Sequence, residues 1–384
     1  MPLAFSTRAT GGGRLAASLL TLAAALAATA APAAEPSHQA LAPPASAWTA
    51  PATVALATED VSFRASDSVT FRGTLLVPRG SPKAPLVVVF HGASSPSRNE
   101  ALYDHLKQML PSLGIAVFVY DRRGTGASGG KASGNAYDRL ADDGIAAAQT
   151  LARDPRIDPA RIGFWGLSQG GWLSLLAASR WKQTAFAISV SAPMVTPDVQ
   201  MNFAVANILR IKGYSEADIR LALSARTAVD EFERGQLDRA AAQKRLDAVV
   251  DKPWFPLIYM DKTFADPDKS GWAKEIRHDP LASIGSINAR TLILYGARDP
   301  WVPVAVSVDR LRTFTVSHPN MIAAVVGGAD HAMMMSVPPA RQIDPAFFPV
   351  QAPDSPEYFG RLAAWLQVNG IARSPARADE QRSR

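Results

Sequence analysis

The sequence contains no cysteine among its 384 residues. This absence excludes disulfide bonds, thiolate catalysis, zinc sites with cysteine ligands and a lipoprotein anchor, but it does not exclude export. Charged residues are also sparse, at 19%, and no basic stripe is interleaved with aromatic side chains. The net charge of +6 comes mostly from scattered arginines, so we expect a solvated basic surface and no nucleic-acid partner.

Long apolar runs are missing apart from one at residues 15–30. Arg8 and Arg14 precede this run, and Ala-x-Ala cleavage candidates lie at its end. The pattern is typical of an export signal peptide, which we predict over residues 1–34, and an uncleaved anchor is the alternative. We therefore expect an exported protein, periplasmic or secreted, with no stable membrane span after the signal is cleaved.

Strands and helices alternate along most of the remaining chain. After a predicted hairpin at residues 60–64 and 69–77, near-continuous apolar strands alternate with helical segments. The strands are predicted at residues 85–90, 115–120, 161–165, 185–190, 290–296 and 321–326, and the helices at 100–110, 138–152, 171–178, 304–314 and 356–368. This alternation predicts an α/β fold, with a mostly parallel central sheet and helices on both faces.

The alternation is interrupted by a stretch without strand signals, which predicts an inserted helical cap over residues 196–285. Helices are expected there at residues 197–212, 215–234 and 236–250. The core then comprises residues 53–195 and 286–372, flanked by a disordered linker at 35–52 and a flexible tail at 373–384. Four aromatic residues of the cap either line a substrate pocket or form the cap's own core: Trp254, Phe255, Tyr259 and Trp272.

The sequence Gly166-Leu167-Ser168-Gln169-Gly170 lies between a predicted strand and a predicted helix. A serine on such a sharp turn has strained backbone angles, and bulk two residues to either side would collide with neighbouring elements. The helix that follows directs its N-terminal amides at the serine, so the N–H of Gln169 is placed to bind an oxyanion. The pattern therefore predicts a nucleophilic serine, Ser168.

A serine hydroxyl needs a base to remove its proton and a third group to orient that base. His331 follows the last strand, and Asp299 follows the strand before it, so both belong to the edge of the sheet where Ser168 lies. Asp330 is a rival acid, but a side chain adjacent to the histidine is badly placed to bond its ring. A second oxyanion donor is expected in the N–H of Ala93, after the first central strand.

A further motif, Gly-x-Gly-x-x-Gly at residues 124–129, also follows a strand. It does not fit a dinucleotide site, because residues 130–135 read as more loop where a helix should open. We therefore expect no cofactor and no metal.

Taken together, these motifs resemble the α/β-hydrolase superfamily. The resemblance rests on the serine turn, the His91-Gly92 loop, the Asp121-x-Arg123-Gly124-x-Gly126-x-Ser128 turn, the Gly296-x-x-Asp299-x-x-Val302-Pro303 segment and His331. Within the superfamily, the chain is most similar to serine aminopeptidase-like and dienelactone hydrolase-like or prolyl-oligopeptidase-like proteins. One departure is Arg290, where relatives often carry proline before the strand.

The resemblance implies that Ser168 is the nucleophile, His331 the base, Asp299 the acid, and Ala93 and Gln169 the oxyanion donors. It implies a serine hydrolase, with a small-molecule carboxylic ester as the expected substrate. A thioesterase or lactonase would share this site, and a catalytically silent ligand-binding protein is a further alternative. An aminopeptidase-type enzyme would need an anchor for a substrate amine, for which Asp261, Asp266 and Asp268 are candidates. The sequence carries no signal for an oligomeric state.

Overall fold

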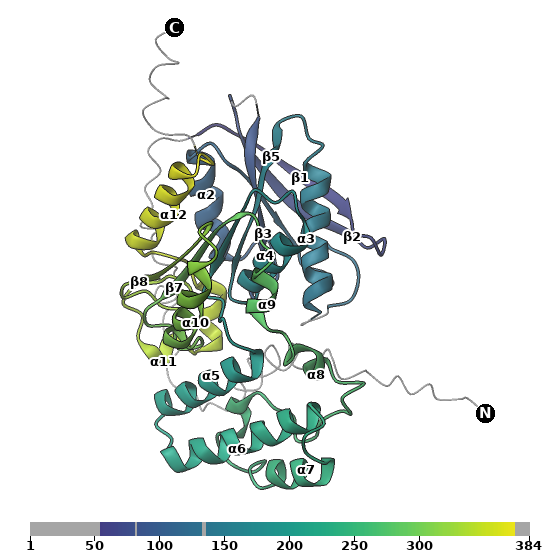
Figure 1. Ribbon diagram of the computed structural model, residues 1–384, viewed down its shortest axis with the longest axis vertical. Coiled ribbons are helices and arrows are strands. Elements are labelled where there is room, and N and C mark those ends of the chain that lie inside the picture. Colours follow the sequence, from purple (N-terminus) through teal and green to yellow (C-terminus); the bar gives the residue numbers. More distant parts are fainter. Residues whose placement is uncertain (1–53, 81–82, 133–135, 373–384) are drawn as a thin grey trace, which may run out of the picture.

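The computed structural model of the protein describes residues 54–80, 83–132 and 136–372 (Figure 1). The predicted signal peptide, linker and C-terminal tail lie outside the described residues. Across those described ranges, no helix combines the length and the apolar character that crossing a membrane requires.

The core is built on a sheet of eight strands in the order β1-β2-β4-β3-β5-β6-β7-β8. The strands are β1 (Leu56–Arg64), β2 (Thr70–Pro78), β3 (Ala84–Phe90), β4 (Ala116–Tyr120), β5 (Ile157–Leu167), β6 (Phe186–Val190), β7 (Arg290–Gly296) and β8 (Met321–Val326). Strand β2 runs antiparallel to both of its neighbours, and all other pairs are parallel. The predicted fold class, a mostly parallel sheet with helices on both faces, is confirmed.

The central strands are buried on both faces, as their continuous apolar sequence predicts. In β3, Val88 and Phe90 join one apolar cluster and Val87 and Val89 join the other, because successive side chains point to opposite faces. Helices α3 (Tyr137–Leu151), α4 (Gln169–Arg180), α9 (Pro280–Ile284) and α10 (Val304–Val316) contribute to the first cluster. Helices α2 (Asp104–Ser112) and α12 (Pro356–Val368) contribute to the second.

The segment between β6 and β7, apart from α9, forms a separate helical layer, drawn below the sheet in Figure 1. It comprises α5 (Pro197–Ile211), α6 (Glu216–Glu233), α7 (Arg239–Asp247), η3 (Phe255–Ile258) and α8 (Gly271–Glu275). Helix α6 begins with a capping box between Ser215 and Asp218. Helix α7 begins later than predicted because the Asp238 side chain caps its start, and it also ends earlier than predicted. The layer has an apolar core of its own, which includes Val205, Leu209 and Ile219.

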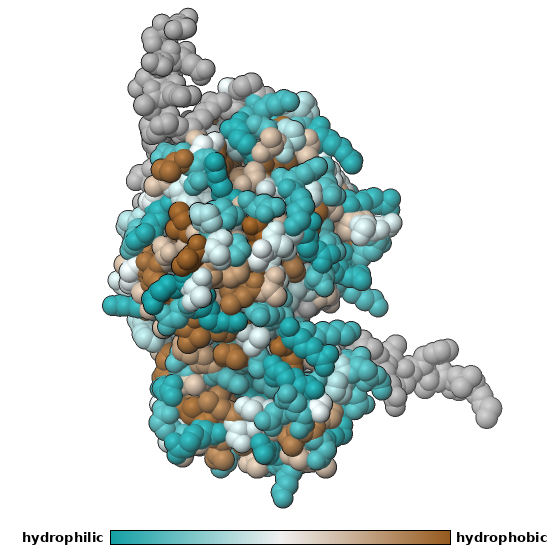
Figure 2. Space-filling model, viewed as in Figure 1, coloured by the Kyte–Doolittle hydropathy of each residue, from teal (hydrophilic) through white to brown (hydrophobic). Residues whose placement is uncertain are grey.

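The helix predicted at residues 100–110 is divided into η2 (Ala101–Tyr103) and α2, and the sequence did not predict five other short helices: α8, α9, η3, α11 (Pro339–Gln342) and η4 (Pro345–Val350). Such segments are too short to establish a hydrophobic period. The face of the molecule shown in Figure 2 is largely hydrophilic, with smaller hydrophobic patches that include one where the cap meets the core.

Candidate active site

Ser168 lies on the turn between the end of β5 and the start of α4, as predicted. Its backbone has φ +57° and ψ −121°, a conformation that is strained for a residue with a side chain. Neighbouring elements hold this conformation, because the Ser168 N–H donates to the carbonyl of Val190 at 2.8 Å and its own carbonyl accepts from the N–H of Gly171 at 2.9 Å. The turn places Ser168 directly beyond the end of β5 and before the first residue of α4.

The glycines around Ser168 are required by close backbone packing. A Cβ on Gly166 would collide with the backbone of Gly170, and one on Gly170 would collide with the carbonyl oxygens of Phe90 and His91. The turn is therefore packed directly against the end of β3, where no larger residue fits. This packing brings Ser168 next to the loop that follows β3.

His331 and Asp299 are joined by a hydrogen bond of 2.7 Å between Nδ1 of the ring and Oδ2 of the carboxylate. The Asp299 side chain has no exposed surface, and its other oxygen accepts from the N–H groups of Trp301 at 2.8 Å and Val302 at 3.0 Å. These two backbone hydrogen bonds fix the orientation of the carboxylate that accepts from the His331 ring. Because Nδ1 donates to Asp299, Nε2 of His331 is the nitrogen that can accept a proton.

The electrostatic surroundings of His331 favour its charged form. Burial of the ring lowers its pKa, but the negative charge of Asp299, the hydrogen bond to Asp299 and the charge of Asp330 act in the opposite direction. The net result is a pKa above the ordinary value for histidine. A base of this kind accepts a proton readily and stabilises the resulting imidazolium.

Asp330, the rival acid, has a different partner set. Its Oδ1 accepts from the N–H groups of Ala332 at 2.9 Å and Met334 at 2.8 Å, so it shapes the turn that carries His331. Burial is the main reason that the pKa of Asp330 is raised to about 6, and the hydrogen bonds from the turn oppose that rise. The structure therefore places Asp299 against the imidazole ring and Asp330 against the backbone.

The loop after β3 is held by Tyr103, a residue that the sequence analysis did not single out. The buried Tyr103 hydroxyl accepts from the N–H of Gly92 at 3.2 Å and donates to the carbonyl of Ser95 at 2.7 Å. A buried tyrosine hydroxyl normally needs a hydrogen-bond partner, but the sequence did not indicate which partner Tyr103 would have. The loop that carries Ala93 is thereby fixed from below.

His91, at the start of the same loop, lies edge-on between the rings of Tyr103 and Tyr120, with centroid distances of 5.3 and 4.9 Å. Burial lowers the pKa of His91 to about 3, and the charge of Arg122 adds to this effect. His91 is therefore neutral and supports the loop.

A cavity of about 540 Å³ lies between the sheet and the cap. On the core side it is lined by Ser168, His331, Ala93 and Gln169, which the sequence analysis had assigned to one site. Its size is within the range typical of small-molecule sites.

Of the four cap aromatics, Tyr259 and Trp272 line this cavity. The prediction is wrong for Trp254 and Phe255, which are buried in the cap's own core. Trp254 is only 1% exposed, and its Nε1 donates to Asp218 at 3.0 Å. Aromatic composition identified the residues but not the direction of their side chains, because the segment between α7 and α8 has no regular period.

Four charged residues of the cap also line the cavity and were missed by the sequence analysis: Arg226, Asp230, Glu233 and Glu275. The first three recur at helical spacing on α6, and this spacing was the signal that could have identified them. Of the candidate amine anchors, Asp261 lines the cavity, whereas Asp266 pairs with Arg239 at 2.7 Å.

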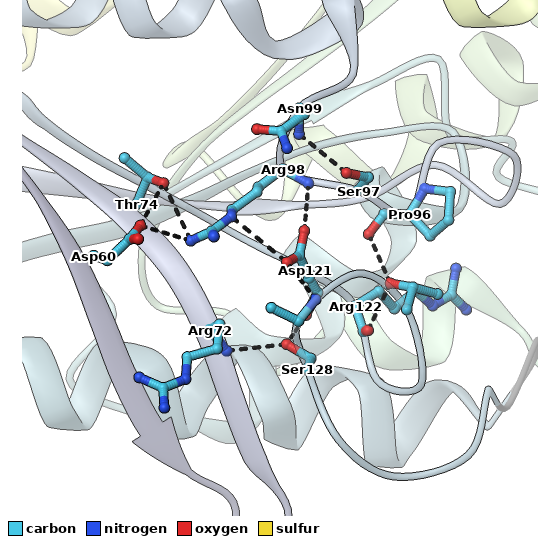
Figure 3. A network of polar contacts seen from close by, with 12 residues as sticks. Asp60, Arg72, Thr74, Pro96, Ser97, Arg98, Asn99, Asp121, Arg122 and Ser128 are labelled. Carbon is cyan, nitrogen blue, oxygen red and sulfur yellow. Dashed lines mark hydrogen bonds and ion pairs between the residues drawn. The ribbon is translucent and has the colours of Figure 1, made fainter.

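The Gly-x-Gly-x-x-Gly loop is organised by Asp121, as Figure 3 shows. The Asp121 carboxylate accepts from the N–H groups of Arg98 at 3.1 Å and Ala127 at 2.9 Å. The Ser128 hydroxyl donates to the Asp121 carbonyl at 2.7 Å and accepts from the N–H of Arg72 at 3.0 Å. These bonds fold the loop onto the edge of the sheet as a structural turn.

Comparison with solved structures shows an α/β-hydrolase fold. The Pyrococcus furiosus esterase PF2001 superposes with a TM-score of 0.51 at 19% identity, over 85% of this chain and 97% of that one. DcsB, solved in complex with its substrate analogue, superposes with a TM-score of 0.52 at 15% identity, over 82% of this chain and 99% of that one. At these identities the likeness concerns the fold alone.

The model of the serine aminopeptidase S33 family matches residues 81–335, and the chain belongs to this family of α/β hydrolases. It is therefore a hydrolase. Polyketide transferase ATR5 of Stachybotrys chlorohalonatus is 33% identical over 139 residues, which cover 36% of this chain and 45% of the relative. Thiohydrolase aneE of Aspergillus aculeatus is 30% identical over 132 residues, which cover 34% of this chain and 40% of the relative. The chain thus spans less than half the length of these curated relatives.

Proposed function

We propose that this hydrolase cleaves carboxylic esters through a covalent acyl-enzyme, with Ser168, His331 and Asp299 as its catalytic triad. The observation that carries the proposal is the 2.7 Å contact between His331 and Asp299, in the same cavity as a serine with a strained backbone. A histidine held by a buried carboxylate is the arrangement that activates a weak hydroxyl nucleophile.

In the first half of the reaction, His331 Nε2 takes the hydroxyl proton of Ser168 as Oγ attacks the ester carbonyl. The negative charge that develops on the carbonyl oxygen is bound by the N–H groups of Gln169 and Ala93. The start of α4 adds a favourable dipole at the same point. The tetrahedral intermediate then breaks its bond to the alcohol, which leaves with the proton from His331.

In the second half, His331 removes a proton from water, which attacks the carbonyl of the acyl-enzyme. The acid is released, and the proton returns from His331 to Ser168. Asp299 keeps its negative charge throughout and stabilises the imidazolium in both steps. The cycle needs no group beyond these side chains and backbone amides.

A thioester is the second candidate substrate, because the relatives include a thiohydrolase and a polyketide transferase by name. Both names concern acyl-group chemistry, which the same nucleophile and oxyanion donors can perform. Hydrolysis rates for matched oxygen esters, thioesters, lactones and anilides of one acyl group separate these classes. We expect the oxygen ester to be turned over fastest, and a clear preference for the thioester would favour the second candidate.

The test of the catalytic assignment is labelling with a fluorophosphonate probe, followed by peptide mass spectrometry. We expect one adduct, on Ser168, that is lost in Ser168→Ala and in His331→Ala. The matched control is Ser94→Ala, because Ser94 lines the same cavity but is assigned no role in proton transfer, and this variant should keep the adduct. Folded protein that gives no adduct would refute the assignment.

We also propose that the protein is exported, on the basis of the apolar run and the arginines near its start. N-terminal sequencing of the protein recovered from the periplasm or the medium tests this. Cleavage near residue 34 is expected, and recovery of uncleaved protein from the cytoplasm alone would contradict it.

A further inference from the structure

The turn after β4 is joined to the loop after β3, which carries the proposed oxyanion donor Ala93. Strands β3 and β4 are parallel neighbours, and Val88 pairs with Phe118 near their ends. The two segments that follow these strands therefore leave the sheet at the same edge. Asp121 is the first residue after β4, and only 3% of its surface is exposed.

The Asp121 carboxylate links the two segments (Figure 3). Its Oδ1 accepts from the N–H of Arg98, in the loop after β3, at 3.1 Å, and its Oδ2 accepts from the N–H of Ala127, in its own turn, at 2.9 Å. Nε of Arg98 lies 3.5 Å from Oδ2. An amide side chain has one accepting oxygen in place of two, so asparagine at this position could satisfy only one of the two backbone donors.

Further bonds attach the same loop to the sheet. The Pro96 carbonyl accepts from the N–H of Arg122 at 2.9 Å and from Oγ1 of Thr125 at 3.3 Å. The Arg98 side chain donates to Asp60 of β1 at 2.9 Å. The loop after β3 is thus held at Pro96 and Arg98 by the turn after β4 and by the first strand.

Ala93 and Ser94 lie between these anchors and the bonds to Tyr103, and both line the catalytic cavity. A backbone N–H stabilises an oxyanion when it is held about 2.7–3.1 Å from the position that the oxygen will occupy. A misplacement of about 1 Å can lower a rate by about a hundredfold. The position of the Ala93 N–H therefore depends on how firmly both ends of the loop are held.

The glycine-rich motif provides the space for this carboxylate. Gly126 has φ +52°, and a Cβ on it would lie 2.4 Å from Cγ of Asp121. A residue with a side chain would displace the carboxylate from its two backbone donors. This packing accounts for the motif at residues 124–129 without a bound nucleotide.

We propose that Asp121 is a positioning residue for ester hydrolysis, because it holds the loop that places the N–H of Ala93 against the developing oxyanion. This inference rests on the proposed function and adds a residue to it. Asp121 touches no reacting atom, and the interaction that it supports is made chiefly in the transition state. Its loss should therefore lower kcat with little change in KM.

The first experiment measures the hydrolysis of 4-nitrophenyl butyrate by Asp121→Asn. Its kcat should fall about tenfold or more at a nearly unchanged KM. Titration of the working sites with a fluorophosphonate removes the contribution of unfolded protein from this comparison.

Two matched variants separate positioning from stability. Ser128→Ala alters the same turn, because the Ser128 hydroxyl donates to the Asp121 carbonyl and accepts from the N–H of Arg72. It should lower the urea midpoint and keep kcat. Glu59→Gln removes the charge of a carboxylate that accepts from Arg156 on another part of the sheet, at 3.0 Å, and should keep kcat as well.

A transition-state mimic provides a readout that a purely structural role would not change. When a trifluoromethyl ketone with a hexyl chain binds, Ser168 Oγ forms a bond to the carbonyl carbon, its proton moves to His331, and the carbonyl oxygen becomes an oxyanion. Asp121→Asn should weaken the binding of this ketone by about the factor by which it lowers kcat/KM. The methyl ketone with the same chain, which should form no such adduct, should bind both proteins equally.

Thr125→Val keeps the experiment decisive if Asp121→Asn does not fold. It removes one bond to Pro96 and should show a smaller loss of the same kind. The inference is overturned if kcat and the affinity for the trifluoromethyl ketone stay within about twofold of the unmodified values, or if the two ketones lose affinity alike. An equal loss of kcat in Ser128→Ala would also overturn it. Unmodified protein that neither hydrolyses esters nor labels at Ser168 would refute the proposed function itself.

Discussion

Replacing Asp299 with asparagine should change the pH dependence of the proposed ester hydrolysis and its maximum rate in ways that a simple loss of activity would not. As the proposed base, His331 can act only when it is neutral, so kcat/KM should rise with pH through the pKa of His331 in the unliganded enzyme. In the unmodified protein that pKa is raised above 6.5, so we expect the rising limb to be centred above pH 6.5.

The magnitude of the pKa shift follows from the contact between the side chains of Asp299 and His331. An opposite charge in direct contact shifts a pKa by about 1–3 units, which corresponds to about 1.4–4 kcal/mol. The contact here is 2.7 Å, and the Asp299 side chain has no exposed surface to screen it. When the charge is removed, burial of His331 is opposed only by the charge of Asp330, so the pKa falls.

Removing the charge of Asp299 should therefore shift the rising limb of the pH profile toward acidic pH. With a lower pKa, His331 is neutral at lower pH, and the rising limb of Asp299→Asn moves down by about 1–3 units. The plateau falls in the same variant by about 10⁴-fold, because an amide can stabilise the wrong tautomer of the ring. Asp299→Asn is thus less active than the unmodified protein at every pH. Its activity at low pH, however, should be a larger fraction of its own plateau than in the unmodified protein.

The assay measures kcat/KM for a neutral 4-nitrophenyl ester from about pH 5 to pH 9, at a wavelength where both forms of the product absorb equally. Asp309→Asn is the control, because Asp309 is an exposed helical carboxylate paired with Arg312 and should leave both limb and plateau in place. A limb that stays fixed or moves toward alkaline pH in Asp299→Asn would refute the reasoning.

Three further predictions concern the stability of the fold and the residues that support the site. Gly170→Ala should lower the free energy of unfolding by about 1–3 kcal/mol or more, because the new Cβ would meet the carbonyl of Phe90. Gly360→Ala, in a part of α12 where a Cβ meets no atom within 4 Å, should raise the free energy of unfolding by about 0.5–1 kcal/mol. Urea denaturation of the two variants and the unmodified protein measures both changes. Tyr103→Phe should lower kcat by about tenfold or more with little change in KM, since the loop loses the hydroxyl that fixes it; unchanged steady-state kinetics would contradict this. Burial holds the pKa of His105 near 3 in the folded protein against 6.5 when exposed, so the unfolded chain takes up the proton first as pH falls. From pH 7 to pH 5, this proton uptake should lower the free energy of unfolding of the unmodified protein by about 2 kcal/mol. His105→Gln should lack this contribution, as denaturation of both proteins at the two pH values would show.

The contact between Asp299 and His331 was predictable because the sheet determines it. Strands β7 and β8 are parallel neighbours, and Gly296 pairs with Val326 at their ends. Residues a few positions beyond paired strand ends emerge at the same edge, so the order of the motifs was enough to bring the two side chains together. The turn at Ser168 was predictable for a similar reason, because its glycines mark a backbone packed against its neighbours.

The cap was predictable only as a set of helices. Amphipathic spacing located α5 and α6 to within a few residues, but it could not tell whether Trp254 pointed into the cavity or into the cap. The charged residues of α6 that line the cavity drew no prediction, because the sequence does not distinguish a buried carboxylate from an exposed one. In the structure, this part of α6 lines the cavity, and Asp230 accepts a hydrogen bond from Trp272.

The cap is nevertheless hydrogen-bonded to the segment that follows Asp299, a member of the proposed triad. From α5, Gln200 donates its side-chain amide to the carbonyl of Trp301 at 2.8 Å, and Asn207 donates to the carbonyl of Pro300 at 3.2 Å. These carbonyls belong to the two residues that follow Asp299, so the loop that presents the acid is held from the sheet below and from the cap above. A cap that shifted as a body would strain this loop and with it the hydrogen bond to His331. The cap and the proposed site of proton transfer at His331 are therefore linked through one segment of backbone, and a ligand that fixes α5 against the core should also fix the proposed triad.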